Sequence, residues 1–186
     1  AYTVGNRLIV RKGNTRKAFD LGFYTNIANI SPDGTQVAYS NLDGQMFVIN
    51  VTAGAKEFLP VTYGYRPIWS PDGSKIAIEI IDGTFAVQER ASKKVYNLGY
   101  GEAISWANNS DELIFTKKDF VLDFQIESSS IQKIKYNGTE QLTLVKSSDN
   151  LPSDAIITRD NKLYVPYKTG AKRGLVVKNL VEGITP

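Results

Sequence analysis

The chain has 186 residues, of which 42% are hydrophobic and 22% are charged, a composition typical of a globular protein large enough to bury its own core. It contains no cysteine and no histidine, which excludes disulfides, thiolate or imidazole metal sites and Ser-His-Asp catalysis within these residues. The net charge of +3 is mild, and no apolar run approaches the roughly 18 residues of a membrane span. We therefore expect one domain over residues 1–186, without a membrane span, a metal site or a cofactor.

The first 22 residues predict three short strands. These are Tyr2–Val4, Arg7–Arg11 and Arg16–Leu21, separated by turn residues at Gly5-Asn6 and around Gly13. Glycine and asparagine are typical of tight reversals because they accept left-handed backbone angles. The segment resembles part of a unit that recurs more fully later in the chain.

Two later stretches share one pattern of turns. Ser31–Gly34 and Ser70–Gly73 both read Ser-Pro-Asp-Gly, and their aspartates are 39 residues apart. A second turn signal, Asp43-Gly44 and then Asp82-Gly83, follows ten residues after each of these aspartates. Proline presets φ, aspartate bonds its own backbone and glycine accepts positive φ, so turn chemistry explains the residue types. A period of about 40 residues with frequent turns predicts a repeated unit of four short strands.

Each full unit divides at these turns into predicted strands. They are residues 26–31, 36–40, 45–51 and 56–61 in the first unit, and 67–70, 75–80, 84–90 and 94–98 in the second. A degenerate third unit predicts strands at 103–106, 112–117, 120–127 and 131–136, with 141–146 as an extension, and the last unit predicts strands at 155–158, 162–167 and 175–180. The extra length between Glu127 and Asn150 predicts an enlarged outer hairpin. Because residue 1 falls inside a unit, we expect the chain to be cut from a longer protein.

The two Ser-Pro-Asp-Gly turns, each followed by an apolar strand, resemble the repeat of TolB-like β-propellers. That repeat is also called the WD-repeat-like PD motif, and the propeller domains of dipeptidyl peptidases are related to it. Ala107–Asn109 and Arg159–Asn161 depart from the pattern in the turn itself. The resemblance implies an all-β propeller of four-stranded blades with about five blade-equivalents. The chain could close a small ring, form part of a larger one, or pair its open ends with another chain.

The loops that connect one predicted unit to the next are the most distinctive. They are Gly22–Thr25, Thr62–Arg66 and Gly99–Glu102, and they combine glycine with aromatic residues. In a propeller such loops gather on one face, where tyrosine offers a large contact area and a polar tip. The predicted binding rim consists of Phe23, Tyr24, Tyr63, Tyr65, Arg66, Tyr100 and Glu102. The alternative is that these rings wedge between neighbouring blades.

The carboxylates do not predict a catalytic pair. Asp33 and Asp72 lie inside Pro-Asp-Gly turns, where bonding to the backbone accounts for them better than a metal or a reaction does. Asp82, Glu79, Glu102 and Asp154 are further candidates, but no spacing brings two of them into one cleft as acid–base catalysis requires. Trp69 and Trp106 occupy corresponding positions and are expected to pack between sheets.

Lysine and arginine gather in two regions. One is an outer hairpin near the N-terminus and the other lies near the C-terminus: Arg7, Arg11, Lys12, Arg16 and Lys17, and then Lys168, Lys172, Arg173 and Lys178. Such residues commonly protect exposed strand edges from pairing. An anionic polymer would need a basic groove, which spacing alone does not provide, so we do not expect a nucleic-acid partner.

The resemblance implies a binding or scaffolding module without catalysis. It implies a protein or peptide partner, with a glycan as an alternative, and a location in the bacterial periplasm or at the cell surface. A second hypothesis is the accessory propeller domain of a peptidase or other hydrolase, where it would control substrate access. A third is a propeller enzyme that acts on polysaccharide. A propeller fold by itself does not distinguish these functions.

Overall fold

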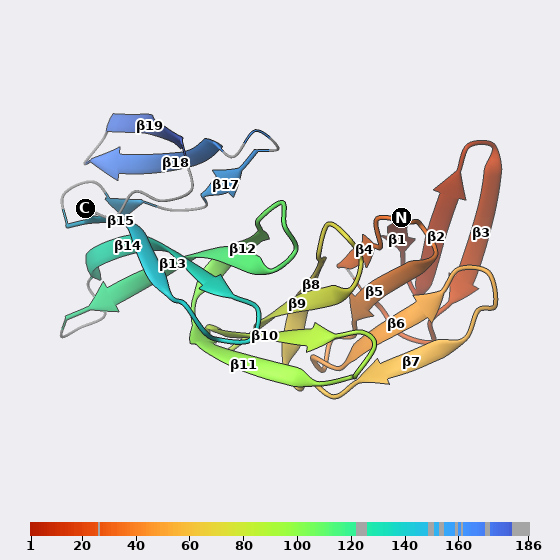
Figure 1. The fold of residues 1–186 in the computed structure, drawn as a ribbon. Helices are drawn as coiled ribbons and strands as arrows, with labels where there is room; N and C mark the ends of the chain where they lie inside the picture. Colours follow the sequence, from red (N-terminus) through yellow and green to blue (C-terminus); the bar gives the residue numbers. More distant parts are fainter. Residues whose placement is uncertain are drawn as a thin grey trace. The chain divides into compact units, whose positions relative to one another are not determined.

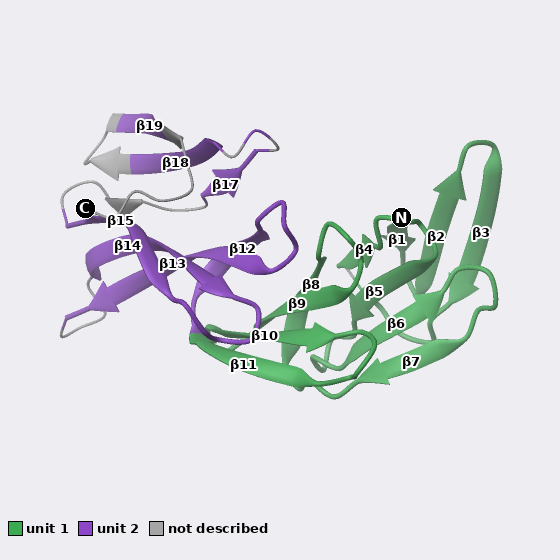
Figure 2. Ribbon diagram, viewed as in Figure 1, with its two compact units in different colours: residues 1–99 green, residues 100–186 purple. Residues whose placement is uncertain are grey.

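The computed structural model describes residues 1–25, 27–121, 126–148, 151–152, 155–158, 160, 162–169 and 172–179. Within these ranges the chain forms five antiparallel sheets and no helix (Figure 1), so it has no helix there that could cross a membrane. It divides into two compact units, residues 1–99 and residues 100–186 (Figure 2). The predicted all-β organisation in about five repeated sheets is confirmed.

The first sheet of unit 1 contains the three strands predicted from the first 22 residues. They are β1 (Tyr2–Val4), β2 (Arg7–Lys12) and β3 (Thr15–Asp20), which pair in that order. Three consecutive residues of β2, Leu8 to Val10, are buried. Because successive side chains of a strand point to opposite faces, such a run requires cover on both faces of the sheet.

The next two sheets are the full four-stranded repeats, and each pairs its strands in chain order. Their strands are β4 (Ala28–Ile30), β5 (Gln36–Ser40), β6 (Met46–Asn50) and β7 (Lys56–Leu59), then β8 (Gly64–Trp69), β9 (Lys75–Ile80), β10 (Thr84–Glu89) and β11 (Val95–Tyr100). The predicted division into four strands is confirmed. The largest shift is at β8, which begins at Gly64 instead of Pro67, while Asn26 of the predicted first strand lies outside the described residues.

The two Ser-Pro-Asp-Gly turns are built by the same hydrogen bonds. The Ser31 hydroxyl donates to Asp33 Oδ1 at 2.6 Å, and the Thr35 amide donates to the same oxygen at 3.0 Å. In the second copy Ser70 and Ser74 bond Asp72 at 2.6 and 2.9 Å. These bonds confirm the turn-forming role predicted for both aspartates.

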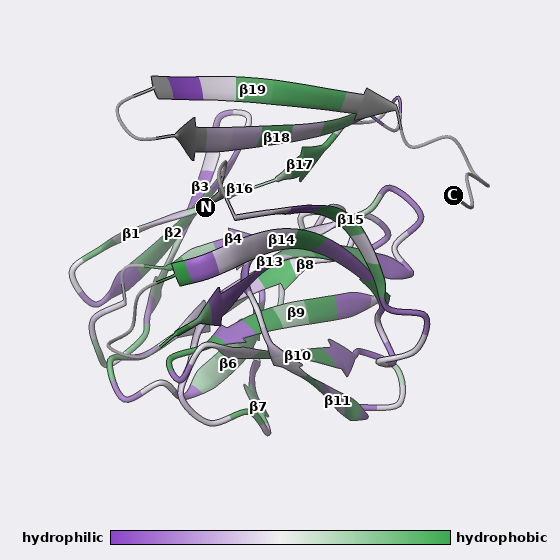
Figure 3. Cartoon of the chain, turned by 90° about the vertical axis from the view of Figure 1, so that its left-hand side faces the viewer, coloured by the Kyte–Doolittle hydropathy of each residue, from purple (hydrophilic) through white to green (hydrophobic). Residues whose placement is uncertain are grey.

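The core of unit 1 alternates between the two faces of β5. Val37 and Tyr39 join a cluster that includes Leu8 of β2, whereas Ala38 joins a second cluster that includes Trp69 and Ile78 of the next sheet. All six side chains are buried. The hydrophobic stretches along the strands are visible in Figure 3, for example on β9. The sheet of β4 to β7 therefore packs against the sheet before it and the sheet after it.

Trp69 combines burial with a bond between sheets. Its indole Nε1 donates to the backbone oxygen of Asn29 at 3.0 Å, and the residue is 7% exposed. Trp106 of unit 2 is 8% exposed. The packing role predicted for Trp69 is confirmed, and Trp106 is buried.

Unit 2 contains the remaining two sheets. The first has β12 (Glu102–Trp106), β13 (Glu112–Phe120), β14 (Ile126–Lys135) and β15 (Leu142–Ser147), and the second has β16 (Leu151–Pro152), β17 (Ile156–Ile157), β18 (Lys162–Thr169) and β19 (Lys172–Asn179). A buried cluster within this unit contains Ile114, Ile131, Ala155, Leu163 and Val165. Arg159, Asn161, Gly170 and Leu180, which the sequence assigned to the last unit, lie outside the described residues.

The predicted division of the third unit is wrong in its middle. Residues 112–117, 120–127 and 131–136 were expected to be three strands, but β13 and β14 are two long strands that form one hairpin. Ser128, Ser129 and Ser130 resemble a polar break in the sequence, yet all three are buried within β14. The extra length therefore lies largely in these two strands, and β15 (Leu142–Ser147) is the outer strand expected only as an extension.

The aspartates of the repeated turns predict an acid-sensitive contribution to stability. Bonding from Ser31 and Thr35 lowers the pKa of Asp33 from 3.8 to about 2. Burial raises the pKa of Asp72, but bonds from Ser70 and Ser74 outweigh it and lower the pKa to about 2. Because the folded pKa lies below the unfolded one, the stabilisation is complete above about pH 5 and is lost as the pH falls from about 4 through 2.

We therefore expect the double variant Asp33→Asn/Asp72→Asn to melt below the wild type at neutral pH. Thermal unfolding followed by circular dichroism at several pH values should show this gap closing between about pH 4 and pH 2. Asp43→Asn is the control, because that carboxylate accepts no hydrogen bond from the described residues. A gap that stays constant down to about pH 2 would contradict a role for the ionised carboxylates.

Candidate functional site

The alternating strand directions place several loops of unit 1 at one edge of its sheets. Each connection between sheets and each turn between the second and third strands of a full repeat lies at this edge. The Ser-Pro-Asp-Gly turns lie at the opposite edge. We call the first set the turn face, and it consists of residues 4–6, 21–25, 41–45, 60–65 and 81–83.

Tyr63 is the residue that ties neighbouring loops of the turn face together. Its backbone oxygen accepts a hydrogen bond from the amide of Ile81 at 3.0 Å. On its other side Gly44 packs so closely that a Cβ at that position would lie 2.5 Å from the Cα of Tyr63. The turn between β5 and β6 and the turn between β9 and β10 therefore both contact Tyr63.

The backbone of Tyr63 is in the left-handed region, with φ at 58°. Glycine adopts this conformation commonly. For a bulky residue the conformation is strained and costs about 1–2 kcal/mol. The side chain is nevertheless 65% exposed, so burial of the ring does not offset the strain. Strained residues of this kind concentrate at functional sites, and Tyr63 is therefore the strongest single candidate on this face.

Large apolar side chains are exposed on the turn face, and two of them, Leu42 and Ile81, lie on the turns that contact Tyr63. Tyr24 is 65% exposed, Leu42 74% and Ile81 65%, and Val4 is exposed as well. Contiguous apolar groups on a protein surface mark interaction sites more often than isolated ones do. The tyrosines of this face are predicted from the sequence, whereas the aliphatic residues are not. The available signal was the spacing of Leu42 and Ile81, which are 39 residues apart and each precede an Asp-Gly turn.

The other predicted rim residues of unit 1 have different environments. Phe23 is half-buried, with its ring centroid 5.4 Å from that of Phe47, so it packs into the core. Tyr65 is 36% exposed, and its backbone oxygen accepts a bond from the Ser40 hydroxyl. Arg66 forms an ion pair with the buried Glu79 at 3.2 Å.

Two predicted rim residues belong to unit 2. Tyr100 is exposed, and Glu102 forms an ion pair with Lys118 across the β12–β13 pair. Because the division between the units falls at Tyr100, the turn face as defined within unit 1 does not include them. Exposure of Tyr24, Tyr63 and Tyr100 is the opposite of what wedging between sheets would require, whereas Phe23 fits that alternative.

The candidate acids are engaged in structural bonds. Asp82 accepts bonds from the Thr84 hydroxyl and amide, and both lower its pKa. A general acid at neutral pH needs the opposite shift. Glu79 and Glu102 are each held by a cation, and Asp154 lies outside the described residues. The described part of the chain also contains no cluster of three acidic residues able to hold a metal ion.

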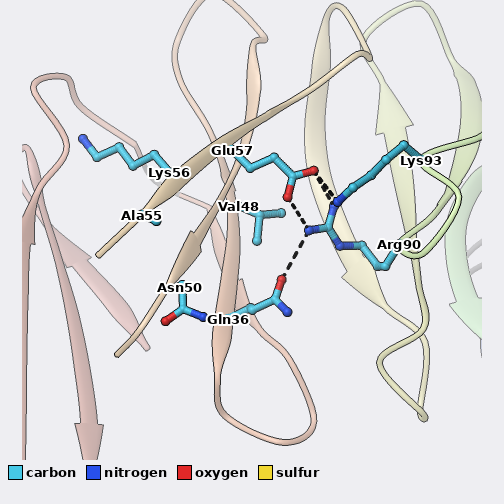
Figure 4. Close-up of a pocket in the computed structure, with 8 residues that line it drawn as sticks. All are labelled: Gln36, Val48, Asn50, Ala55, Lys56, Glu57, Arg90 and Lys93. Carbon is cyan, nitrogen blue, oxygen red and sulfur yellow. Dashed lines mark hydrogen bonds and ion pairs between the residues drawn. The ribbon is translucent and has the colours of Figure 1, made fainter. Parts of the chain in front are cut away.

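A shallow cavity of about 360 Å³ lies away from the turn face, beside the opposite edge of the two full repeats (Figure 4). Arg90 Nη2 contacts Glu57 at 2.8 Å, Lys93 contacts the same carboxylate at 2.7 Å, and the guanidinium lies 5.8 Å from the Trp69 ring centroid. Both cations are thus already paired with Glu57, and they lower its pKa. This network links the second and third sheets of unit 1, and its partners are too far apart in sequence for spacing to predict them.

Comparison with family models finds no match, and neither does comparison with curated proteins. Solved structures do match. TolB from Acinetobacter baumannii aligns with a TM-score of 0.62 and 14% identity, covering 92% of this chain and 45% of TolB. The chain has the fold of a TolB-like β-propeller.

Two peptidases share this propeller fold. The tricorn protease aligns with a TM-score of 0.65 and 11% identity, over 85% of this chain and 20% of the protease. The acylaminoacyl peptidase of Pyrococcus horikoshii aligns with a TM-score of 0.52 and 17% identity, over 84% of this chain and 32% of the peptidase. The chain thus spans less than half the length of each of these proteins, and the likeness establishes its fold.

The close packing at Gly44 predicts that the turn face is sensitive to this residue. Gly44→Ala should destabilise unit 1 by about 2–4 kcal/mol, because it combines a positive φ with a clash against the Tyr63 backbone. Gly13→Ala is the matched control, since Gly13 also has a positive φ and has no atom within 4 Å of an added Cβ. Equal losses in urea unfolding for the two variants would show that the contact with Tyr63 contributes nothing.

Proposed function

We propose that this chain is a non-catalytic binding module that docks a protein partner on the turn face of unit 1. The observation that carries the proposal is Tyr63, a strained residue whose large side chain is exposed. A glycine at this position would remove the strain, so the ring needs a reason outside the fold. Tyrosine is enriched where proteins meet because it buries a large area at a small entropic cost.

The surroundings of Tyr63 support docking. Leu42 and Ile81 extend the apolar surface on two turns that contact the Tyr63 backbone. Such a surface, held on short turns of a rigid sheet, needs little ordering when a partner binds. A peptide is the simplest occupant, and a glycan is the alternative because exposed tyrosine rings can stack on sugars.

The likeness to TolB supports a location in the bacterial periplasm or at the cell surface, where the family resemblance implies protein–protein interaction. A second candidate is favoured by the two peptidase structures, in which the aligned propeller is 20% and 32% of a longer chain. In that case this chain would be the accessory propeller of a hydrolase. A hydrolase domain encoded in the same reading frame would support the second candidate. The hypothesis of a propeller enzyme that acts on polysaccharide would need measured turnover of a polysaccharide.

The experiment that tests docking is replacement of Tyr63 by glycine. Tyr63→Gly should leave the melting temperature unchanged or raise it, because glycine relieves a strain of about 1–2 kcal/mol. The same change should weaken capture of partners from an extract of the source organism, identified by mass spectrometry. Tyr63→Ala/Tyr65→Ala should weaken capture in the same way.

Phe23→Ala is the contrasting variant. Its ring packs beside Phe47 and Tyr39, so its loss should destabilise the protein by about 2 kcal/mol or more. If Tyr63→Gly lowered the melting temperature as strongly as Phe23→Ala and left capture intact, Tyr63 would be a structural residue and the docking proposal would fail.

A further inference from the structure

The two turns that contact Tyr63 carry corresponding pairs of exposed residues, each an aliphatic residue followed by aspartate. Leu42-Asp43 lies on one turn and Ile81-Asp82 on the other, 39 residues apart, and all four residues are exposed. Tyr63 is therefore flanked on both sides by an aliphatic side chain followed by a carboxylate. The chain repeats this arrangement in two consecutive sheets.

The turn itself does not require the carboxylate of Asp43. In that turn Asn41 Oδ1 accepts the amides of Asp43 at 3.1 Å and Gln45 at 2.8 Å. The Asp43 carboxylate makes no hydrogen bond or ion pair with any residue that the structure describes. In the other turn both bonds from Thr84 reach Asp82 Oδ1, which leaves Oδ2 for another partner.

The turn face is anionic although the chain is not. Its residues, 4–6, 21–25, 41–45, 60–65 and 81–83, include two aspartates and no lysine or arginine, whereas the whole chain has 22 basic and 19 acidic residues. Three cations border the face by sequence or by contact, Arg7, Arg66 and Lys56, and among the described residues none of them pairs with Asp43 or Asp82. Arg66 is paired with Glu79, and Lys56 donates to the backbone oxygens of Asp20 and Leu21. Neither interaction neutralises Asp43 or Asp82.

This combination suits one kind of side chain. Lysine and arginine have a long apolar stem that can cover an aliphatic surface and a cationic tip that remains polar. The stem fits Leu42 or Ile81, the cation fits the neighbouring carboxylate, and a tyrosine ring attracts a cation over its face. A phosphate or an acidic peptide would instead meet two uncompensated carboxylates.

We propose that the turn face around Tyr63 docks a polypeptide segment that presents lysine or arginine side chains to Asp43 and Asp82. This inference rests on the proposed docking function and adds the chemistry of the partner. The duplicated aliphatic–carboxylate pair provides a place for two basic side chains, one on each side of Tyr63. Binding should therefore weaken with rising salt concentration, because exposed charge pairs are screened.

A random-peptide phage-display library selected on the immobilised wild-type chain tests this inference. The enriched peptides should contain lysine or arginine together with apolar residues. Affinities of synthetic copies should fall about tenfold or more for Asp43→Asn/Asp82→Asn, since charge-assisted bonds are lost. The asparagine at position 82 keeps an acceptor for Thr84, so the turn is preserved. Asp111→Asn/Glu140→Gln removes the same charge from unit 2 and should leave the affinity unchanged.

The possible outcomes separate the two proposals. If the peptides lost binding to Tyr63→Gly but not to Asp43→Asn/Asp82→Asn, the docking function of the turn face would stand. The proposal that its partner is basic would fail. Enrichment of acidic peptides, or of none, would overturn the basic partner as well. Peptides that bind Tyr63→Gly as tightly as the wild type would overturn both.

Discussion

Burial of both faces of short strands is the constraint on which this structure depends. In β5 the residues Val37, Ala38 and Tyr39 are all buried, and they alternate between two separate clusters. A single sheet cannot cover both of its own faces, so each repeat is stable only between neighbours. Because consecutive strands pair antiparallel, the chain reverses direction at each turn, which sorts the loops of unit 1 into two opposite edges.

The two edges use their polar groups differently. At the edge with the Ser-Pro-Asp-Gly turns, Asp33 and Asp72 are bonded by neighbouring hydroxyls and amides. Beside this edge, Arg90 and Glu57 link one sheet to the next. At the turn face the Asp43 carboxylate and the Tyr63 ring serve no comparable internal purpose. Polar and apolar groups that the fold does not use are the ones available to a partner.

The strain at Tyr63 connects stability with the proposed function. Gly44 allows the Tyr63 backbone to approach, and the bond from Ile81 fixes its carbonyl. The left-handed conformation is therefore imposed by the two turns around it. Natural proteins retain such local costs where a side chain must be held in a fixed place. General acid catalysis by Asp82 would instead need a raised pKa, and bonding from Thr84 lowers it.

The sequence was sufficient to predict the repeat, its four-strand division in unit 1 and the turn-forming role of Asp33 and Asp72, because turns depend on local backbone preferences. It did not determine that Ser128 to Ser130 lie within a long strand, since only pairing with β13 and burial decide this. From the sequence, Phe23 and Tyr63 were both predicted to belong to the binding rim, because each is an aromatic residue beside a glycine. Only the tertiary structure separated them, placing Phe23 against Phe47 and leaving Tyr63 exposed between two turns, because exposure depends on neighbours distant in the chain.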